Sequence, residues 1–186
     1  TLDRSSAASD VYKRQPLSRM REFVLATKAI FRAWNEGEKL DFKGEYYTHT
    51  LMPPLFKPSP SHKGPPPIYL GGVSAKATAV AGEVADGLLV HPFHTERYLR
   101  EISLPAIDEG RARSGLTREG FVLSVQALIG VGTNDEDIDA ARSMIRNQIA
   151  FYASTPAYAS VLELEGFPEL QPTCLLYTSD AAAERS

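Results

Sequence analysis

The stretch Pro66–Thr95, PPIYLGGVSAKATAVAGEVADGLLVHPFHT, decides the fold class of this 186-residue chain. A short apolar segment, Ile68–Leu70, runs into two glycines and then into an alanine-rich helical pattern over residues 74–85. A turn at residues 86–87 leads into a second apolar segment, Leu88–Val90. Short apolar strands that alternate with helices are typical of parallel strands covered by helices. The stretch therefore predicts an α/β fold.

The same alternation continues on both sides of this stretch. Apolar residues at helical spacing predict a helix that begins near Ser18 and ends before Gly37. After Thr95, which can cap a helix, we expect a third strand over Phe121–Val131 and a long helix that begins at a capping box, Thr133–Glu136. Residues 38–66 are proline-rich and lack periodicity. Long irregular segments of this kind are often lids or binding loops.

The number of strands is too small for a complete sheet. Three parallel strands would leave two unpaired edges and an uncovered face. The strand spacing of roughly 20 to 35 residues suits a (β/α)8 barrel and equally suits a doubly wound sheet. Periodicity alone leaves both architectures open.

The two ends of the chain carry a pattern that indicates DNA of another origin. One permitted coding of Ala8–Gln15 has a reverse complement that, read one base out of frame, encodes Cys174–Asp180. A transposon-end sequencing adaptor leaves such an inverted repeat at both ends of a short insert. We therefore expect residues 1–15 and 174–186 to be adaptor-derived tails, and residues 16–173 to be a fragment of a longer gene product. Natural disordered tails are the alternative interpretation.

Charge and composition argue against several classes of function. The formal net charge of −3 is unfavourable for binding to nucleic acid or to an anionic membrane surface. No apolar run approaches the roughly 20 residues of a membrane span, and the single cysteine, Cys174, cannot form an internal disulfide. We expect a cytoplasmic protein whose partner is a small-molecule substrate, with no nucleic-acid or membrane partner. Homo-oligomerisation of the full-length protein stays open.

The residues that follow the first predicted strand are Gly71, Gly72, Val73 and Ser74. Ligands of parallel α/β folds collect at the carboxyl ends of strands. Glycines let backbone N–H groups approach an anion, and the start of the next helix favours a phosphate. The same glycines can equally make a tight turn from strand to helix. The pattern is not G-x-G-x-x-G, so it gives no support to a dinucleotide fold.

Two histidines, His91 and His94, follow the second predicted strand. A histidine at this place can hydrogen-bond a substrate oxygen or exchange a proton near neutral pH. It can also be a structural residue. Metal binding is the weaker interpretation, because two histidines three residues apart lack a third ligand. We therefore expect no metal site.

Several segments of the sequence resemble those of a known family. The run PPIYLGGVSAKATAVAGEVADGLLVHPF, together with FKGEYY and a proline-rich stretch before it, is similar to the luciferase-like oxidoreductases. These enzymes are (β/α)8 barrels that use reduced flavin or the deazaflavin coenzyme F420. The variants HPFHTERYLREISLPAIDEG and RNQIAFYASTPAYASVLELEGF look most like the F420-dependent branch. The resemblance spans nearly all of residues 16–172.

The resemblance implies a fold and a site. It implies the middle-to-late strands of an incomplete (β/α)8 TIM barrel, with Gly71, Gly72, Val73 and Ser74 at the coenzyme phosphate. His91 and His94 would be the catalytic residues that contact substrate, and residues 38–66 would cover the pocket. The implied activity is hydride transfer between F420 and a small organic substrate. The alternatives are an FMN-dependent monooxygenase of the same fold and a truncated, noncatalytic polypeptide without activity of its own.

Overall fold

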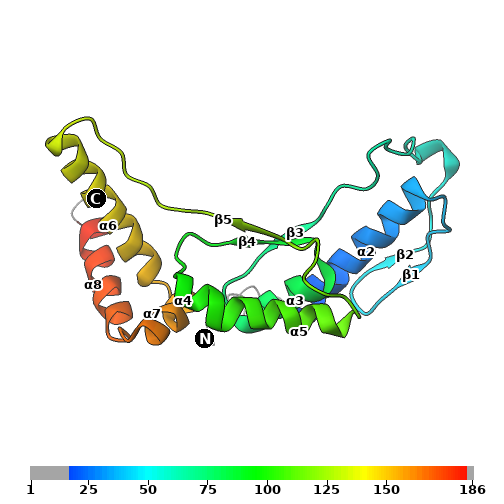
Figure 1. Cartoon of the computed structure of the whole chain (residues 1–186). Helices are drawn as coiled ribbons and strands as arrows, with labels where there is room; N and C mark the ends of the chain where they lie inside the picture. Colours follow the sequence, from blue (N-terminus) through cyan, green and yellow to red (C-terminus); the bar gives the residue numbers. More distant parts are fainter. Residues whose placement is uncertain (1–16, 184–186) are drawn as a thin grey trace, which may run out of the picture.

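The computed structural model describes the backbone of residues 17–183 and the side chains of residues 17–176. Its centre is a three-stranded parallel sheet in the order β3-β4-β5, formed by Tyr69–Gly71, Gly87–Val90 and Val122–Val125 (Figure 1). Leu88 of β4 pairs with Leu70 and Leu123 on its two sides. The predicted α/β fold is therefore confirmed, with strands and helices close to the expected places.

The third strand is shorter than predicted. The sequence predicts it over Phe121–Val131, but β5 ends at Val125. Its only neighbour among the described strands is β4, which ends at Val90. Pro92 lacks the N–H that a longer ladder would need, so apolar composition alone cannot extend the pairing.

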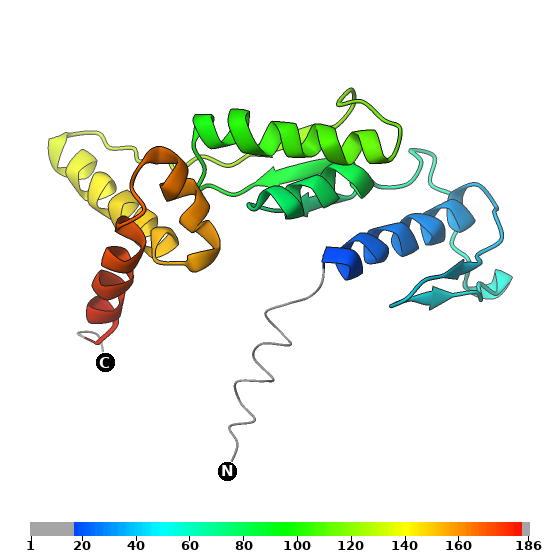
Figure 2. The same ribbon diagram turned by 90° about the horizontal axis from the view of Figure 1, so that it is seen from below.

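Helices cover one face of the sheet. Two of them, α3 (Ala75–Val84) and α5 (Leu104–Arg113), lie side by side under the strands (Figures 1 and 2). Short α4 (Glu96–Tyr98) leads into α5 through a π-helical segment, η2 (Leu99–Ser103). Pro105 accounts for this interruption, because a proline cannot donate to the carbonyl four residues earlier and its ring clashes with that carbonyl.

The main core lies between these helices and the sheet. Its fully buried residues are Ala81, Ala85, Leu88, Val90 and Ile107. The opposite face of the sheet carries no helix in Figure 1. Its outward side chains remain exposed, at 39% for Tyr69, 40% for Leu89 and 43% for Val122. In the described part of the chain the sheet is thus open and does not close into a barrel.

The first helix, α2 (Leu17–Asn35), begins and ends as predicted. The region after it is more regular than expected, since it contains a hairpin of β1 (Phe42–Lys43) and β2 (Thr48–His49) and a short 3-10 turn, η1 (Pro54–Phe56). The Glu22 carboxylate of α2 holds this hairpin. It accepts hydrogen bonds of 2.7–2.9 Å from the backbone N–H groups of residues 45, 46 and 47.

A helical group forms the other end of the molecule (Figures 1 and 2). It consists of α6 (Asp135–Ala153), η3 (Pro156–Tyr158), α7 (Ala159–Glu165) and α8 (Leu170–Ala183). Helix α8 packs against α6 and runs through the predicted boundary of the C-terminal tail at residue 174. The N-terminal tail lies outside the described residues. The adaptor origin of both tails stays a prediction.

The capping box of α6 is shifted by one residue from the predicted position. The N-cap is Asn134, whose Oδ1 accepts from the Asp137 N–H at 2.9 Å. The Asp137 carboxylate reaches back and accepts from the N–H and the hydroxyl of Thr133. Asparagine caps helices as well as threonine does, and Asp137 supplies the acidic partner in place of Glu136.

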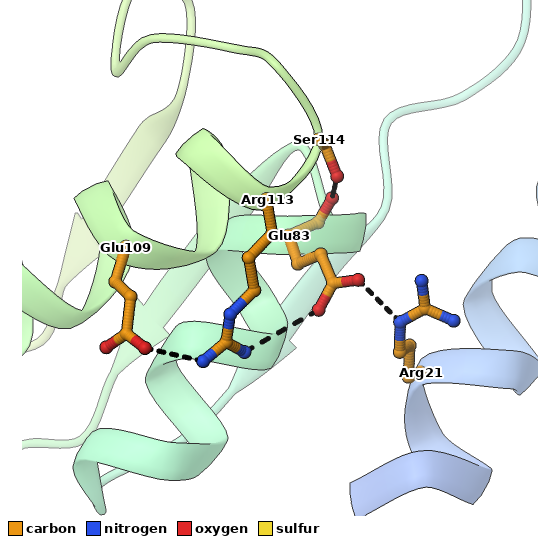
Figure 3. A network of polar contacts seen from close by, with 5 residues as sticks. All are labelled: Arg21, Glu83, Glu109, Arg113 and Ser114. Carbon is orange, nitrogen blue, oxygen red and sulfur yellow. Dashed lines mark hydrogen bonds and ion pairs between the residues drawn. The ribbon is translucent and has the colours of Figure 1, made fainter.

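A network of polar contacts connects the helices of the covered face (Figure 3). Glu83 of α3, whose side chain is only 10% exposed, accepts from Arg21 of α2 at 2.6 Å and lies 3.8 Å from Arg113 of α5. Arg113 also pairs with Glu109 on its own helix, and the Ser114 hydroxyl donates to the Glu83 carbonyl at 2.8 Å. One acidic residue thus joins α2, α3 and α5.

Helices α3 and α5 approach so closely that their crossing requires glycine. A Cβ atom at Gly82 would lie 2.5 Å from the carbonyl oxygen of Ile107, and one at Gly110 would lie 2.8 Å from the backbone nitrogen of Glu83. Real Cβ atoms do not approach backbone atoms this closely. The two backbones therefore pack directly on each other, with no side chain between them.

At this crossing, replacing glycine by alanine should change stability in the direction opposite to that seen in an ordinary helix. Alanine in place of glycine normally stabilises a helix by about 1 kcal/mol. We expect Gly110→Ala instead to lower the free energy of unfolding by about 1–3 kcal/mol, because the added methyl group forces the helices apart. Urea unfolding followed by circular dichroism measures the difference. A gain in stability would show that the crossing has room for a side chain.

Candidate functional site

The carboxyl ends of the three strands meet at one pocket. It has a volume of about 380 Å³. Its lining residues are Gly71, Gly72, Val73, Leu89, Val90, His91, Gln126 and Tyr158. The structure therefore brings His91 together with three of the four residues predicted at the phosphate. The lining does not include Ser74 or His94.

The two glycines have different surroundings. A Cβ atom at Gly72 would lie 3.3 Å from the Cβ of Ala77, a close contact that would push the turn away from the first turn of α3 by a few tenths of an ångström. A Cβ atom at Gly71 would meet nothing within 4 Å. Gly71 therefore leaves free space in front of the backbone at the pocket. Gly72 therefore fits the interpretation of the pair as a tight turn from strand to helix. Gly71 fits the interpretation as a place where a ligand can approach the backbone.

Ser74 is the N-cap of α3. Its Oγ accepts a hydrogen bond of 3.3 Å from the N–H of Ala77. One of the free N–H groups in the first turn is thereby satisfied, and the others keep the partial positive charge of a helix start. Ser74 thus contributes to the site by beginning the helix next to Gly72 and Val73.

His91 lies at the end of β4 between two tyrosine rings. Tyr158 stacks on it with ring centroids 4.5 Å apart, and Tyr152 packs edge-on at 4.7 Å. The His91 Nδ1 accepts from the backbone N–H of Phe93 at 3.1 Å, and its Nε2 lies 3.1 Å from the Tyr158 hydroxyl. Burial lowers the pKa of His91, which favours the neutral ring.

Tyr158 is the site residue that the sequence did not reveal. It comes from η3, 67 residues after His91 in the chain. In the sequence it is one of several aromatics near the end of a long helix, and no spacing connects it with a strand end. Only the packing of the helical group α6–α8 places it at the pocket.

The structure does not bring His94 into this pocket. Its ring packs edge-on against Tyr98 with centroids 5.2 Å apart, and its Nε2 lies 3.3 Å from the Ser103 hydroxyl. Its Nδ1 is buried and has no hydrogen-bond partner in the described part of the chain. Burial first, and then the charge of His91, lower the pKa of His94. Its predicted contact with a substrate stays a prediction.

Two further kinds of feature do not occur among the described residues. No group of three or more His, Cys, Asp or Glu side chains there could hold a metal ion. Over the same residues, none of the helices combines the length and the apolar character that crossing a membrane requires.

The two histidines predict a pH dependence of stability. Both folded-state pKa values lie below the ordinary value of 6.5, so the unfolded chain binds protons more readily than the folded one. Their contribution to stability is complete above about pH 6.5 and is lost as the pH falls through the folded-state pKa values. We expect urea unfolding to show lower stability at about pH 5.5 than at about pH 7.5, and the difference to shrink in a His91→Gln/His94→Gln variant. An undiminished difference would assign the pH dependence to other groups.

Comparison with known proteins supplies the family. A family model described as luciferase-like monooxygenase matches residues 7–173. An uncharacterized protein of Mycobacterium tuberculosis is 47% identical over 157 residues, which are 84% of this chain and 46% of that protein. The 5,10-methylenetetrahydromethanopterin reductase of Archaeoglobus fulgidus is 34% identical over 156 residues, 83% of this chain and 42% of the enzyme.

A solved structure agrees on the fold. The coenzyme F420 dependent tetrahydromethanopterin reductase from Methanopyrus kandleri superposes with a TM-score of 0.61 at 22% identity, over 82% of this chain and 40% of that enzyme. The chain thus spans less than half the length of these relatives. The family model covers most of the chain and confirms the resemblance seen in the sequence. This chain belongs to the luciferase-like monooxygenase family.

Proposed function

We propose that this chain is the middle-to-late part of a (β/α)8 barrel, and that the parent protein is an oxidoreductase that transfers a hydride between coenzyme F420 and a small organic substrate. Relatives named for F420 support the choice of coenzyme. They include the Methanopyrus reductase and an F420-dependent glucose-6-phosphate dehydrogenase of Nakamurella multipartita, 29% identical over 103 residues. The exposed apolar face of the sheet supports the barrel, because further strands would cover it.

The observation that carries the proposal is the open backbone at Gly71. A phosphate needs close approach to N–H groups at a helix start, and the pocket offers it at the junction of β3 and α3. No charged side chain belongs to the described lining, so the backbone and the helix dipole would balance the anion. Gly71, Gly72, Val73 and Ser74 would therefore hold the phosphate end of the coenzyme.

The coenzyme supplies hydride chemistry when it is bound, and no protein nucleophile is needed. The contribution of this chain is to bind and orient. Gly71 and Val73 line the pocket. His91, neutral and packed against two tyrosine rings at the end of β4, would hydrogen-bond a ligand or exchange a proton by giving up its hydrogen bond to Tyr158. For His94 we retain a role next to the substrate that would require the ring to turn out of its buried position.

The description of the family as luciferase-like monooxygenases favours a second candidate. A luciferase-like monooxygenase would use reduced FMN, whose phosphate would bind at the same residues, 71–74.

We also propose that the parent protein acts in the cytoplasm. The isolated chain, with its open sheet face, would be inactive as a truncated piece. Association of full-length subunits into a homo-oligomer would be compatible with these proposals.

The two coenzymes can be compared directly. We expect the full-length protein of the surrounding gene to bind F420 at least roughly tenfold more tightly than FMN in fluorescence titrations. The reverse order would select the FMN monooxygenase. Absence of binding to both would overturn the proposal of a coenzyme site.

The proposed phosphate site predicts that valine at Gly71 and valine at Gly72 have different effects. In the full-length protein Gly71→Val should raise the dissociation constant for F420 by roughly tenfold or more and leave the thermal midpoint nearly unchanged, because a Cβ atom at this position meets no atom of the described residues within 4 Å. Gly72→Val should lower both affinity and midpoint, since its side chain meets Ala77. Unchanged affinity in Gly71→Val would contradict a phosphate at this turn.

A further inference from the structure

The hydrogen bonds around His91 fix the position of its proton. The backbone N–H of Phe93 can only donate, so the Nδ1 that accepts it at 3.1 Å must carry a lone pair. A neutral imidazole has one N–H group, which must then be on Nε2. Burial lowers the pKa of His91 and so favours this neutral form near pH 7.

The proton on Nε2 determines whether the Tyr158 hydroxyl accepts or donates in its hydrogen bond with His91. The Nε2–H points to the Tyr158 oxygen at 3.1 Å, so this oxygen accepts, and the phenolic hydrogen stays available for another partner. Within the described residues no second hydrogen-bond partner of this hydroxyl occurs. Tyr158 lines the same pocket as Gly71 and Gly72.

Aromatic packing holds this arrangement in place. Tyr158 stacks on His91 at an interplanar angle of 28°, and Tyr152 stands nearly perpendicular to Tyr158, at 87°. Phe93 packs against both tyrosines, with centroids 5.9 and 6.3 Å away. A ring supported on several sides keeps its hydroxyl in one place at little cost in side-chain entropy.

We infer that the Tyr158 hydroxyl donates its hydrogen to an oxyanion of the ligand in this pocket, and that His91 is a positioning residue that directs this hydrogen. The inference rests on the proposed function and names a specificity residue for it. The ligand group is a phosphate oxygen, because the pocket is also lined by Gly71, Gly72 and Val73, which lead directly into α3, and its described lining has no carboxylate that would repel an anion. A hydrogen bond from the neutral His91 polarises the phenol and strengthens it as a donor.

The first test removes only the hydroxyl. In the full-length protein we expect Tyr158→Phe to raise the dissociation constant for F420 by roughly tenfold, as expected for loss of a hydrogen bond to a charged group. Tyr152→Phe is the matched control, since it removes a hydroxyl from a ring beside His91 that is not part of the pocket lining. Its dissociation constant should stay within about twofold of the wild type.

The second test separates positioning by His91 from simple packing. We expect His91→Phe, which keeps an aromatic ring but has no donor, to weaken binding nearly as much as Tyr158→Phe. The two changes together should cost no more than either alone, because both act through one hydrogen. His91→Gln, which returns a donor at the place of Nε2, should restore most of the affinity. Nitrogen-15 NMR of the wild type should show a proton on Nε2 and none on Nδ1.

The outcomes separate this inference from the function on which it rests. If wild type binds F420 and Gly71→Val weakens it but Tyr158→Phe does not, the role of Tyr158 is wrong and the proposed function stands. A proton on Nδ1 of His91, or additive effects of the two substitutions, would overturn the positioning role. If the wild type binds neither F420 nor FMN, both proposals fail together.

Discussion

The contact of α3 with α5 through bare backbone is the constraint on which the rest of the structure depends. Gly82 and Gly110 let the two helices cross without side chains between them. Both helices can therefore lie on the same face of the sheet and bury Leu88 and Val90 beneath them. Glu83 adds α2 to this layer through Arg21. The position of α3, and with it the start of the helix behind Gly72, follows from this packing.

The helices of this layer leave the opposite face of the sheet uncovered. Tyr69, Leu89 and Val122 point away from the helices and remain substantially exposed. Parallel sheets are normally buried on both faces, because their strands carry apolar residues on both sides. The relatives are more than twice as long as the matched region. These facts agree with the proposal that the strands belong to a barrel whose interior this face would line.

The candidate site depends on contacts between distant parts of the chain. Strand ends bring Gly71 and His91 to one pocket, and the helical group α6–α8 adds Tyr158 to it. The two tyrosines reduce the access of water to His91, and the Phe93 N–H determines which of its nitrogens carries the proton. The chemical character of this histidine is therefore a property of the tertiary structure, although its place at a strand end follows from the local sequence.

The sequence by itself determined the fold class, the order of strands and helices, and the strand-end positions of Gly71, Gly72 and His91, because these depend on local periodicity and on turn chemistry. Only the tertiary structure decided where β5 ends, since a strand extends only as far as its neighbour can pair with it. It also decided that His94 turns toward Ser103 while Tyr158 reaches the pocket. The physical reason is that side-chain packing between residues far apart in the chain leaves no periodic trace in the sequence.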